Sequence, residues 1–373
     1  MKDHHGKEIF KLGFGLMRLP KLEDGSIDVE QTKVMADKFI EAGGTYFDTA
    51  FVYDNGGSED AFRKAVVERY PRESYTLATK LNAWHGAHDE ASAKQEFFTS
   101  LERTGAGYID FYLLHAVQKD NVHLYDEYGI WDFVKEQRDK GLIKHWGFSF
   151  HSDAEFLEKL LADHPDVDFI QLQLNYADWE SESVQSRRCY EVARAHGLPV
   201  VVMEPIKGGK LADPPQPVKD VLKAADPDAT FASWALRYIG SKEGILSILS
   251  GMSNVEQMDQ NLAVFKDFRP LDEKEDAAIK QAQKIIQEDL SIQCTGCRYC
   301  TDGCPMQIPI PDIFEVANDH LLALGNPRAR RQYAYVTKDK GKASDCVQCG
   351  QCEGACPQHL PIIKLLEDCR AME

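Results

Sequence analysis

Residues 45–80 read TYFDTAFVYDNGGSEDAFRKAVVERYPRESYTLATK. Two short apolar runs, residues 45–50 and 75–80, flank a stretch that opens at Ser58 with acidic residues behind it, which favours the start of a helix. The order strand, helix, strand predicts two parallel strands, because the helix carries the chain back to the starting edge of the sheet.

The same alternation continues to about residue 265. The apolar runs that we interpret as strands are residues 13–19, 45–50, 75–80, 108–115, 143–149, 168–175, 199–203 and 245–251. Eight β-then-α units in about 250 residues are typical of a (β/α)₈ TIM barrel. A doubly wound sheet usually has fewer strands and a Gly-rich loop after the first one, whereas PKLEDGS follows here. We therefore predict an α/β fold with a (β/α)₈ barrel over residues 1–270.

Composition excludes several classes of protein. The chain has 373 residues and a formal net charge of −17, which disfavours binding to the phosphates of nucleic acid. No run of 18 apolar residues predicts a membrane span, and the first ten residues lack the apolar core of a signal peptide. We expect a cytoplasmic protein. Nine of the ten cysteines lie in the last 80 residues, eight of them in two closely spaced runs, and in a reducing compartment these runs indicate metal rather than disulfides.

Polar residues end successive predicted strands of the barrel. Asp48, Lys80 and His115 end the second, third and fourth strands, and Tyr53 follows Asp48 by five residues. Barrel enzymes place their chemistry at these strand ends. An ammonium lowers the pKa of a neighbouring phenol, a carboxylate orients the ammonium, and an imidazole N–H can bind a carbonyl oxygen. These four residues would suit hydride delivery to a carbonyl, with Tyr53 as general acid.

Each of these residues has a structural alternative when it is taken singly. Asp48 could cap the next helix, Lys80 could be a solvated strand end, and His115 and Tyr53 could be packing residues. Their joint placement on successive strands favours the catalytic interpretation.

The segments FDTAFVYDNGGSEDAFRKAV, SLERTGAGYIDFYLLHAV and GLIKHWGFSFH resemble those of the aldo-keto reductase family. The resemblance implies a nicotinamide cofactor, NADP or NAD, bound extended at the barrel mouth, and the catalytic tetrad Asp48, Tyr53, Lys80 and His115. It also implies that Ser149 and Gln171 hold the nicotinamide amide. The pyrophosphate would lie along the loop containing Met203, Pro205, Ile206, Lys207, Gly208 and Leu211, and the adenosine end would contact Gly251, Ser253, Gln257 and Asn261.

The chain departs from this family at two positions. Many members carry Arg or Lys after the last glycine to hold the 2′-phosphate of NADP, whereas residues 252–254 here are Met, Ser and Asn. The choice between NADP and NAD therefore stays open, with Lys207 and Lys210 as substitute cations. Phe150 stands where the family often has an asparagine, so that contact falls to His151 or to water.

Two cysteine runs follow the barrel. Each has the spacing C-x₂-C-x₂-C-x₃-C-P, which is the bacterial ferredoxin pattern. For residues 271–373 we therefore predict a linker helix followed by a small, mainly helical ferredoxin-like domain. We expect two [4Fe–4S] clusters, one held by Cys294, Cys297, Cys300 and Cys356 and the other by Cys346, Cys349, Cys352 and Cys304. Each run could instead close on its own cluster or bind a smaller one. Zinc sites usually have paired C-x₂-C units, so zinc is the weaker alternative.

Hydride transfer moves two electrons and an iron–sulfur cluster moves one, and the sequence has no flavin fingerprint to couple them. Three hypotheses follow. The chain is a carbonyl reductase or alcohol dehydrogenase whose clusters exchange electrons with a ferredoxin or flavoprotein partner, or its clusters are purely structural, or it is an electron carrier or nucleotide-binding protein with little turnover. The substrate expected for the first two is a small-molecule carbonyl or alcohol.

Overall fold

The computed structural model describes residues 9–182, 184–289, 291, 292, 294, 296, 298–320, 324–356 and 360–373. It divides into two compact units, Met1–Ala212 with Asp228–Asp276, and Asp213–Pro227 with Ala277–Glu373. Within the described part of the chain, no helix is both long and apolar enough to cross a membrane.

The first unit is a closed barrel of eight parallel strands, which confirms the predicted fold class. The strands are β1 (Leu12–Gly15), β2 (Tyr46–Asp48), β3 (Thr76–Leu81), β4 (Ile109–Val117), β5 (Ile143–Phe150), β6 (Phe169–Gln173), β7 (Val200–Met203) and β8 (Ile245–Ser250). Each strand pairs with the next in sequence, and β1 pairs with β8 to close the ring.

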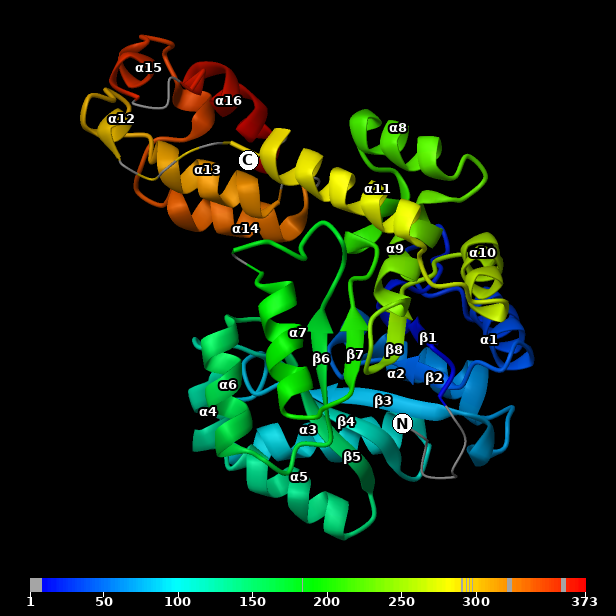
Figure 1. Cartoon of the computed structure of the whole chain (residues 1–373). Coiled ribbons are helices and arrows are strands. Elements are labelled where there is room, and N and C mark those ends of the chain that lie inside the picture. Colours follow the sequence, from blue (N-terminus) through cyan, green and yellow to red (C-terminus); the bar gives the residue numbers. More distant parts are fainter. Residues whose placement is uncertain are drawn as a thin grey trace. The chain divides into compact units, whose positions relative to one another are not determined.

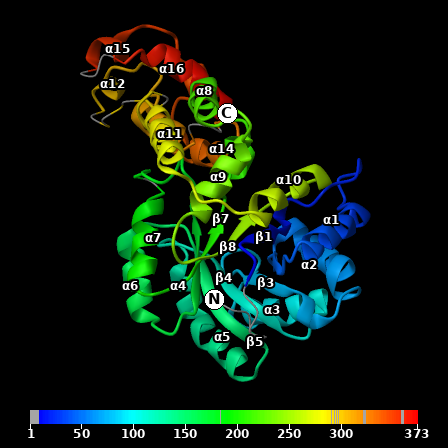
Figure 2. The same ribbon diagram turned by 45° about the vertical axis from the view of Figure 1, so that its right-hand side comes forward.

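Helices surround this barrel (Figures 1 and 2). They are α1 (Val29–Glu41), α2 (Gly57–Phe62), α3 (Glu90–Thr104), α4 (Val122–Glu127), α5 (Ile130–Asp139), α6 (Ala154–Asp163), α7 (Ser186–Ala195), α9 (Phe231–Gly240) and α10 (Val255–Lys266). Several begin at the side chains that helix starts prefer. Asp89 accepts a hydrogen bond from Ser92 N at α3, and Asn254 accepts one from Gln257 N at α10.

Apolar side chains fill the barrel interior, so the strand ends and not the lumen are open to a ligand. Tyr46, Phe111, Phe169, Val201 and Leu249 belong to one buried cluster. Strands β5 and β6 approach closely at Gly147, where a Cβ atom would lie 2.3 Å from the carbonyl oxygen of Phe169. The glycine in GFSFH therefore permits the pairing that brings Ser149 opposite Gln171.

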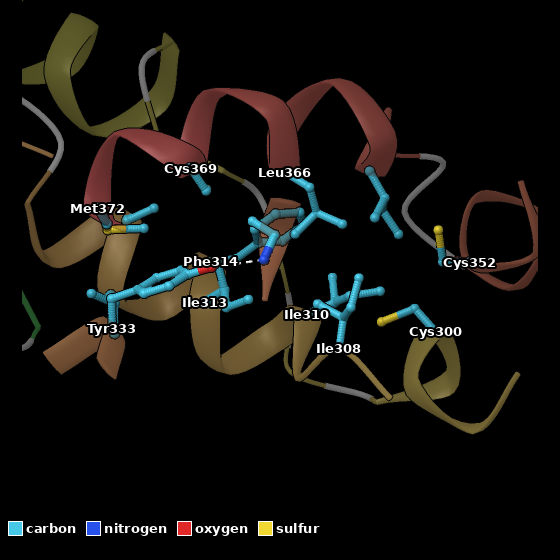
Figure 3. Close-up of a cluster of buried hydrophobic side chains, with 14 of the residues drawn as sticks. Cys300, Ile308, Ile310, Ile313, Phe314, Tyr333, Cys352, Leu366, Cys369 and Met372 are labelled. Carbon is cyan, nitrogen blue, oxygen red and sulfur yellow. Dashed lines mark hydrogen bonds between the residues drawn. The ribbon is translucent and has the colours of Figure 1, made fainter. Parts of the chain in front are cut away.

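The second unit is mainly helical, as predicted. Its helices are α8 (Gln216–Ala225), α11 (Glu273–Lys284, which begins in the first unit), α12 (Tyr299–Asp302), α13 (Ile310–Asp319), α14 (Pro327–Val336), α15 (Gln351–Ala355) and α16 (Ile362–Cys369). Helices α12 to α16 share one compact apolar core, and Figure 3 shows Cys300 and Cys352 at the end of this core that holds Ile308 and Ile310.

Candidate functional site

Three neighbouring strands bring the predicted tetrad together at their carboxyl ends. Asp48 is the last residue of β2, Lys80 lies near the end of β3, and His115 lies near the end of β4. Tyr53 begins a short 3-10 turn in the loop that follows β2. The parallel pairing of β2, β3 and β4 fixes the order of the three strand residues around the rim.

A buried ion pair forms the base of the site. Lys80 Nζ lies 2.7 Å from Asp48 Oδ1 and donates a second hydrogen bond of 2.6 Å to Thr49 O. Both side chains are almost completely buried. Because two charges removed from water require close partners, this geometry fixes the ammonium group in one position beside Tyr53.

The two remaining tetrad residues lie above this pair and face each other. Lys80 Nζ is 4.9 Å from the centroid of the Tyr53 ring. The Tyr53 and His115 rings are 5.7 Å apart in an edge-to-face arrangement. The backbone carbonyl of His115 accepts hydrogen bonds from Trp84 Nε1 and Tyr125 Oη, which hold this part of β4 in place. The phenol and the imidazole thus border the same space.

The protonation states of the site give two neutral donors, Tyr53 and His115, next to the charged Lys80. Burial would lower the pKa of Lys80, but the Asp48 carboxylate and the Tyr53 phenol raise it, so the ammonium stays charged. Burial, together with the charge of Lys80 and the nearby His151, lowers the pKa of His115 well below its usual value. His115 is therefore neutral at physiological pH and keeps one N–H to donate.

The pKa of Tyr53 differs from the sequence-based expectation. Burial raises this pKa, and the opposing effect of Lys80 does not overcome it, whereas the sequence suggested a net lowering by the ammonium. The sequence could not show how much water the folded loop removes from the phenol. The result is a phenol that holds its proton at neutral pH, as a general acid must.

Ser149 and Gln171 lie opposite each other on β5 and β6, and both are buried. Ser149 Oγ accepts a hydrogen bond from Ala116 N, which leaves its O–H available to donate. Gln171 Oε1 is buried and has no hydrogen-bond partner among the described residues. An unsatisfied buried carbonyl oxygen beside a hydroxyl donor fits the N–H and C=O groups of a carboxamide, so these residues suit a nicotinamide.

Phe150 does not replace the asparagine that the family often carries here. It is buried, and its ring lies 6.2 Å from Phe148 and 6.0 Å from Phe156. The substitute contact through His151 stays a prediction.

The loop after β7 is held in a strained conformation with several left-handed residues. Glu204, Lys207, Gly208 and Gly209 all have positive φ angles. Lys207 Nζ pairs with Asp178 at 2.5 Å, which gives this predicted cofactor residue a structural partner. Of the other predicted residues of this loop, Pro205 and Leu211 are buried, Met203 and Ile206 are half-buried, and Gly208 is exposed.

The predicted adenosine site lies at the start of α10. Ser253 N donates to the side chain of Gln257, and both residues are accessible. Asn261, in contrast, is buried and donates to Ser250 Oγ, so it supports the end of β8 from inside. Met252 is buried, and its side chain cannot take the place of an exposed cation.

Arg18 is a cation at this site that the sequence interpretation missed. Its backbone carbonyl accepts a hydrogen bond from Ser253 Oγ, and its Nη1 donates to Gly208 O at 2.9 Å. Its aliphatic carbons lie against Gly251, where a Cβ atom would be 3.5 Å away. Arg18 therefore links the loop after β7 to the loop after β8, and it has no ion pair with a carboxylate among the described residues. The available signal was a lone cation within the apolar run at residues 13–19.

In the second unit, one cavity gathers cysteines from both runs. This cavity is lined by Cys304 of the first run and by Cys346, Cys349 and Cys352 of the second. Four thiols around one space are the donor set that a [4Fe–4S] cluster requires. No three His, Cys, Asp or Glu side chains in the described part of the chain lie in positions to hold a single metal ion.

The other predicted ligand set is described in part. Cys300 is buried, and Cys294 and Cys356 pack against the same apolar core. Cys297 lies outside the described residues.

Cys352 belongs to the set around the cavity. Burial raises the pKa of Cys352 to about 11, so its thiol would remain protonated without a metal to stabilise the thiolate.

Two protein families match separate parts of this chain. Residues 11–284 match the Aldo/keto reductase family, and residues 293–361 match the 4Fe-4S dicluster domain. An uncharacterized oxidoreductase, YqkF of Bacillus subtilis, is 25% identical over 315 residues, which are 76% of this chain and 94% of that protein. Glyoxal reductase of Bacillus subtilis is 26% identical over 57% of this chain and 69% of its own length.

Solved structures with the same barrel include aldo-keto reductase AKR11C1 from Bacillus halodurans in its holo form. It has a TM-score of 0.59 and 24% identity, over 76% of this chain and 96% of that one. An aldo-keto reductase from Klebsiella pneumoniae, in complex with NADP and acetate, has a TM-score of 0.61 and 23% identity, over 75% and 93% of the two chains. These likenesses show the fold.

Proposed function

The chain belongs to the aldo/keto reductase family and carries a 4Fe-4S dicluster domain, and from this premise we propose that its barrel transfers a hydride between NAD(P)H and a carbonyl or alcohol. The observation that carries the proposal is the grouping of Asp48, Lys80, Tyr53 and His115 around one space at the ends of β2, β3 and β4. It is an oxidoreductase whose chemistry requires no metal ligands in the barrel.

Each tetrad residue has one role in carbonyl reduction. The nicotinamide, when bound, supplies the hydride. Tyr53 donates its phenolic proton to the carbonyl oxygen as negative charge develops there, and neutral His115 donates a hydrogen bond to the same oxygen. Lys80 stabilises the phenolate that remains, because its ammonium lies beside the ring. Asp48 keeps Lys80 charged and oriented. In alcohol oxidation the same proton returns to Tyr53.

The cofactor would lie across the strand ends from β5 to β8. Ser149 and Gln171 would hold the carboxamide, since a buried hydroxyl and an unsatisfied amide oxygen are available for it. The loop Met203–Leu211 would follow the pyrophosphate, with Lys207 shaping the loop through Asp178. Gly251, Ser253 and Gln257 would border the adenosine end.

Arg18 favours NADP over NAD in this proposal. The positions after Gly251 lack a cation, and Arg18 supplies one between Gly208 and Gly251. A guanidinium has five N–H donors, and one of them already binds Gly208 O, which leaves the others for a phosphate. We assign to Arg18 the contact with the 2′-phosphate.

For the second unit we propose two [4Fe–4S] clusters that exchange electrons with a protein partner. The cavity lined by Cys304, Cys346, Cys349 and Cys352 supports the ligand set that crosses between the two runs. By the same exchange, Cys356 would complete the set of Cys294, Cys297 and Cys300. The alternative, in which the clusters are purely structural, is supported by the position of Cys300 and Cys352 in the apolar core.

One anaerobic experiment tests both parts. Wild-type protein should oxidise NAD(P)H in the presence of an aldehyde or ketone from a panel, and Tyr53→Phe should lose about 10²–10⁴-fold of that rate while it still binds the cofactor. Full activity in Tyr53→Phe would exclude the acid role.

For the clusters, the brown protein should bleach with dithionite, and Cys352→Ser should lose part of the iron. If this variant keeps carbonyl reduction and a folded second unit but loses electron exchange, the redox role is supported. If the second unit unfolds, the structural alternative is favoured.

A further inference from the structure

The second unit presents an exposed, unpaired row of cations beside its cysteine cavity. Residues 327–342, PRARRQYAYVTKDKGK, contain six basic residues and one acidic residue, although the whole chain has a net charge of −17. We call the six basic residues the basic strip; they are Arg328, Arg330, Arg331, Lys338, Lys340 and Lys342. All six are exposed, and within the described part of the chain none forms an ion pair.

Helix α14 turns the three arginines of this strip outward. Ala329 and Tyr333 are buried against the core of the unit, and Tyr333 donates to Glu373. The opposite side of the helix carries Arg331 and Tyr335, and the side chain of Tyr335 is 80% exposed. A tyrosine that projects between cations and has no packing role is typical of an interface residue, because it can bury a large area at low entropic cost.

The strip continues to the cysteine cavity. Gly341 N donates to Gln307 O, and a Cβ at Gly341 would lie 2.1 Å from Met306 O, so the turn with Lys340 and Lys342 is packed directly on the chain at Met306. Met306 lines the cavity together with Cys304 and Cys349, and Cys349 is itself exposed. The cations therefore end where the thiols reach the surface.

Apolar side chains complete this face at the cavity. Met306 and Val347 both line it, and they are 37% and 59% exposed. A small apolar patch within a charged rim is the usual composition of a protein interface. Acidic residues are present as well: Asp345 accepts from Lys342 N, and Asp312 is held by Arg298. Asp312 is paired with a cation, whereas Asp339 and Asp345 keep their negative charge; the six cations outnumber these two, so the strip keeps a net positive charge.

We propose that the basic strip, Tyr335 and the apolar rim at Met306 and Val347 form the docking surface for an acidic one-electron carrier protein of the ferredoxin or flavodoxin type. The inference rests on the proposed electron exchange and adds to it the face used and the charge of the partner. One electron passes from the reduced carrier to an oxidised cluster, so the carrier is oxidised by one electron and no bond or proton is transferred.

Charge explains why this partner approaches here. Like charges repel an acidic protein from most of a chain with a net charge of −17, whereas the strip attracts it and orients it toward the cavity. The same net charge disfavours a polynucleotide, which would need a far larger basic surface. The position of the strip beside four thiols favours a redox partner over other acidic proteins.

The test uses cluster-loaded protein and a purified acidic ferredoxin as the probe. Binding is measured by calorimetry under anaerobic conditions at low and at high ionic strength. The double variant Arg331→Glu/Lys338→Glu should bind the ferredoxin at least tenfold more weakly, and wild-type binding should weaken as salt increases. Lys64→Glu/Lys159→Glu carries the same charge change on exposed residues of the barrel and should bind within twofold of wild type.

Three results would overturn the proposal. Equal binding by the two double variants would show that total charge, and not this surface, attracts the carrier. Tighter binding of a single-stranded oligonucleotide than of the ferredoxin would assign the strip to nucleic acid. If the clusters bleach with dithionite but the protein does not bind the ferredoxin, the docking surface is rejected and the proposed electron exchange is not. If the clusters never bleach, the proposed electron exchange is rejected as well. Carbonyl reduction should be unchanged in both variants, because neither changes a tetrad residue or a predicted cofactor residue.

Discussion

Replacement of Arg18 by methionine should change the choice of nicotinamide cofactor without impairing the fold. Arg18 is exposed, and so is the side-chain hydrogen bond that it donates to Gly208 O, its single one among the described residues. Methionine preserves the aliphatic contact with Gly251 and removes the guanidinium. The effect on stability should therefore be small, and the effect on a bound phosphate should be large.

The expected loss of NADPH affinity follows from the hydrogen bonds that the Arg18 guanidinium can donate to a phosphate. A hydrogen bond to a charged group contributes about 1.5–3 kcal/mol, and the exposure of Arg18 places its contact at the lower end of this range. At about 1.4 kcal/mol for each factor of ten, the Kd for NADPH should rise about tenfold. The Kd for NADH should change less than about twofold, since NADH has no 2′-phosphate.

The assay is a fluorescence titration of each reduced cofactor, with Lys210→Met as the matched control. Lys210 is an exposed cation of the loop after β7, which Arg18 contacts at Gly208, and it was one of the two substitute cations that the sequence offered. Arg18→Lys should recover part of the NADPH affinity. If Arg18→Met weakens NADPH and NADH equally, the guanidinium contacts the pyrophosphate, and the assignment to the 2′-phosphate is wrong. If Lys210→Met has the larger effect, Lys210 is the selective residue.

Three further predictions concern stability, each measured by denaturant titration. Lys80→Met should lower the free energy of unfolding by about 3–5 kcal/mol because it leaves the Asp48 carboxylate buried and unpaired. The double variant Asp48→Asn/Lys80→Met should recover much of this loss. If it does not, packing and not charge holds the two side chains together. Burial raises the pKa of Glu275, but Arg237 and Arg269 outweigh this effect and lower it to about 2. The ionised Glu275 therefore stabilises the folded protein fully above its ordinary pKa of about 4.3, and this stabilisation is lost as the pH falls toward 2. Glu275→Gln should thus cost about 2 kcal/mol at neutral pH and only a small fraction of this near pH 2, and a difference that is independent of pH would contradict this. Gly341→Ala should destabilise the second unit by about 1–3 kcal/mol because its Cβ would meet a backbone oxygen, whereas Gly354→Ala has open space around it and should be neutral; equal effects would show that the turn at Gly341 can relax.

The barrel and the tetrad could be predicted because both depend on order along the chain. Alternating apolar and amphipathic segments set the strand count, and Asp48, Lys80 and His115 end successive strands, so parallel pairing alone brings them to one rim. The spacing of the cysteines predicts a ligand set that combines Cys304 with residues of the second run; these cysteines line one cavity, and the ligand set itself stays a prediction.

What could not be predicted depends on contacts between distant loops. Lys207 lies in the predicted cofactor loop, but its partner Asp178 follows a different strand. Arg18 was included in an apolar run and treated as strand, yet β1 ends at Gly15 and a short 3-10 turn carries Arg18 toward the loop after β8. The net pKa of Tyr53 depends on the water excluded by its surroundings, which no local sequence pattern encodes.

The central claim is that the barrel passes a hydride directly from the nicotinamide to a carbonyl carbon, with the proton supplied by Tyr53. The most direct measurement reduces an aldehyde or ketone with NADPH or NADH deuterated at the transferable position of C4, and locates the deuterium in the alcohol by mass spectrometry and NMR. The account predicts one deuterium on the carbinol carbon, and a product-forming rate that collapses in Tyr53→Phe. An alcohol whose carbinol hydrogen comes from solvent, formed equally fast without Tyr53, would contradict it.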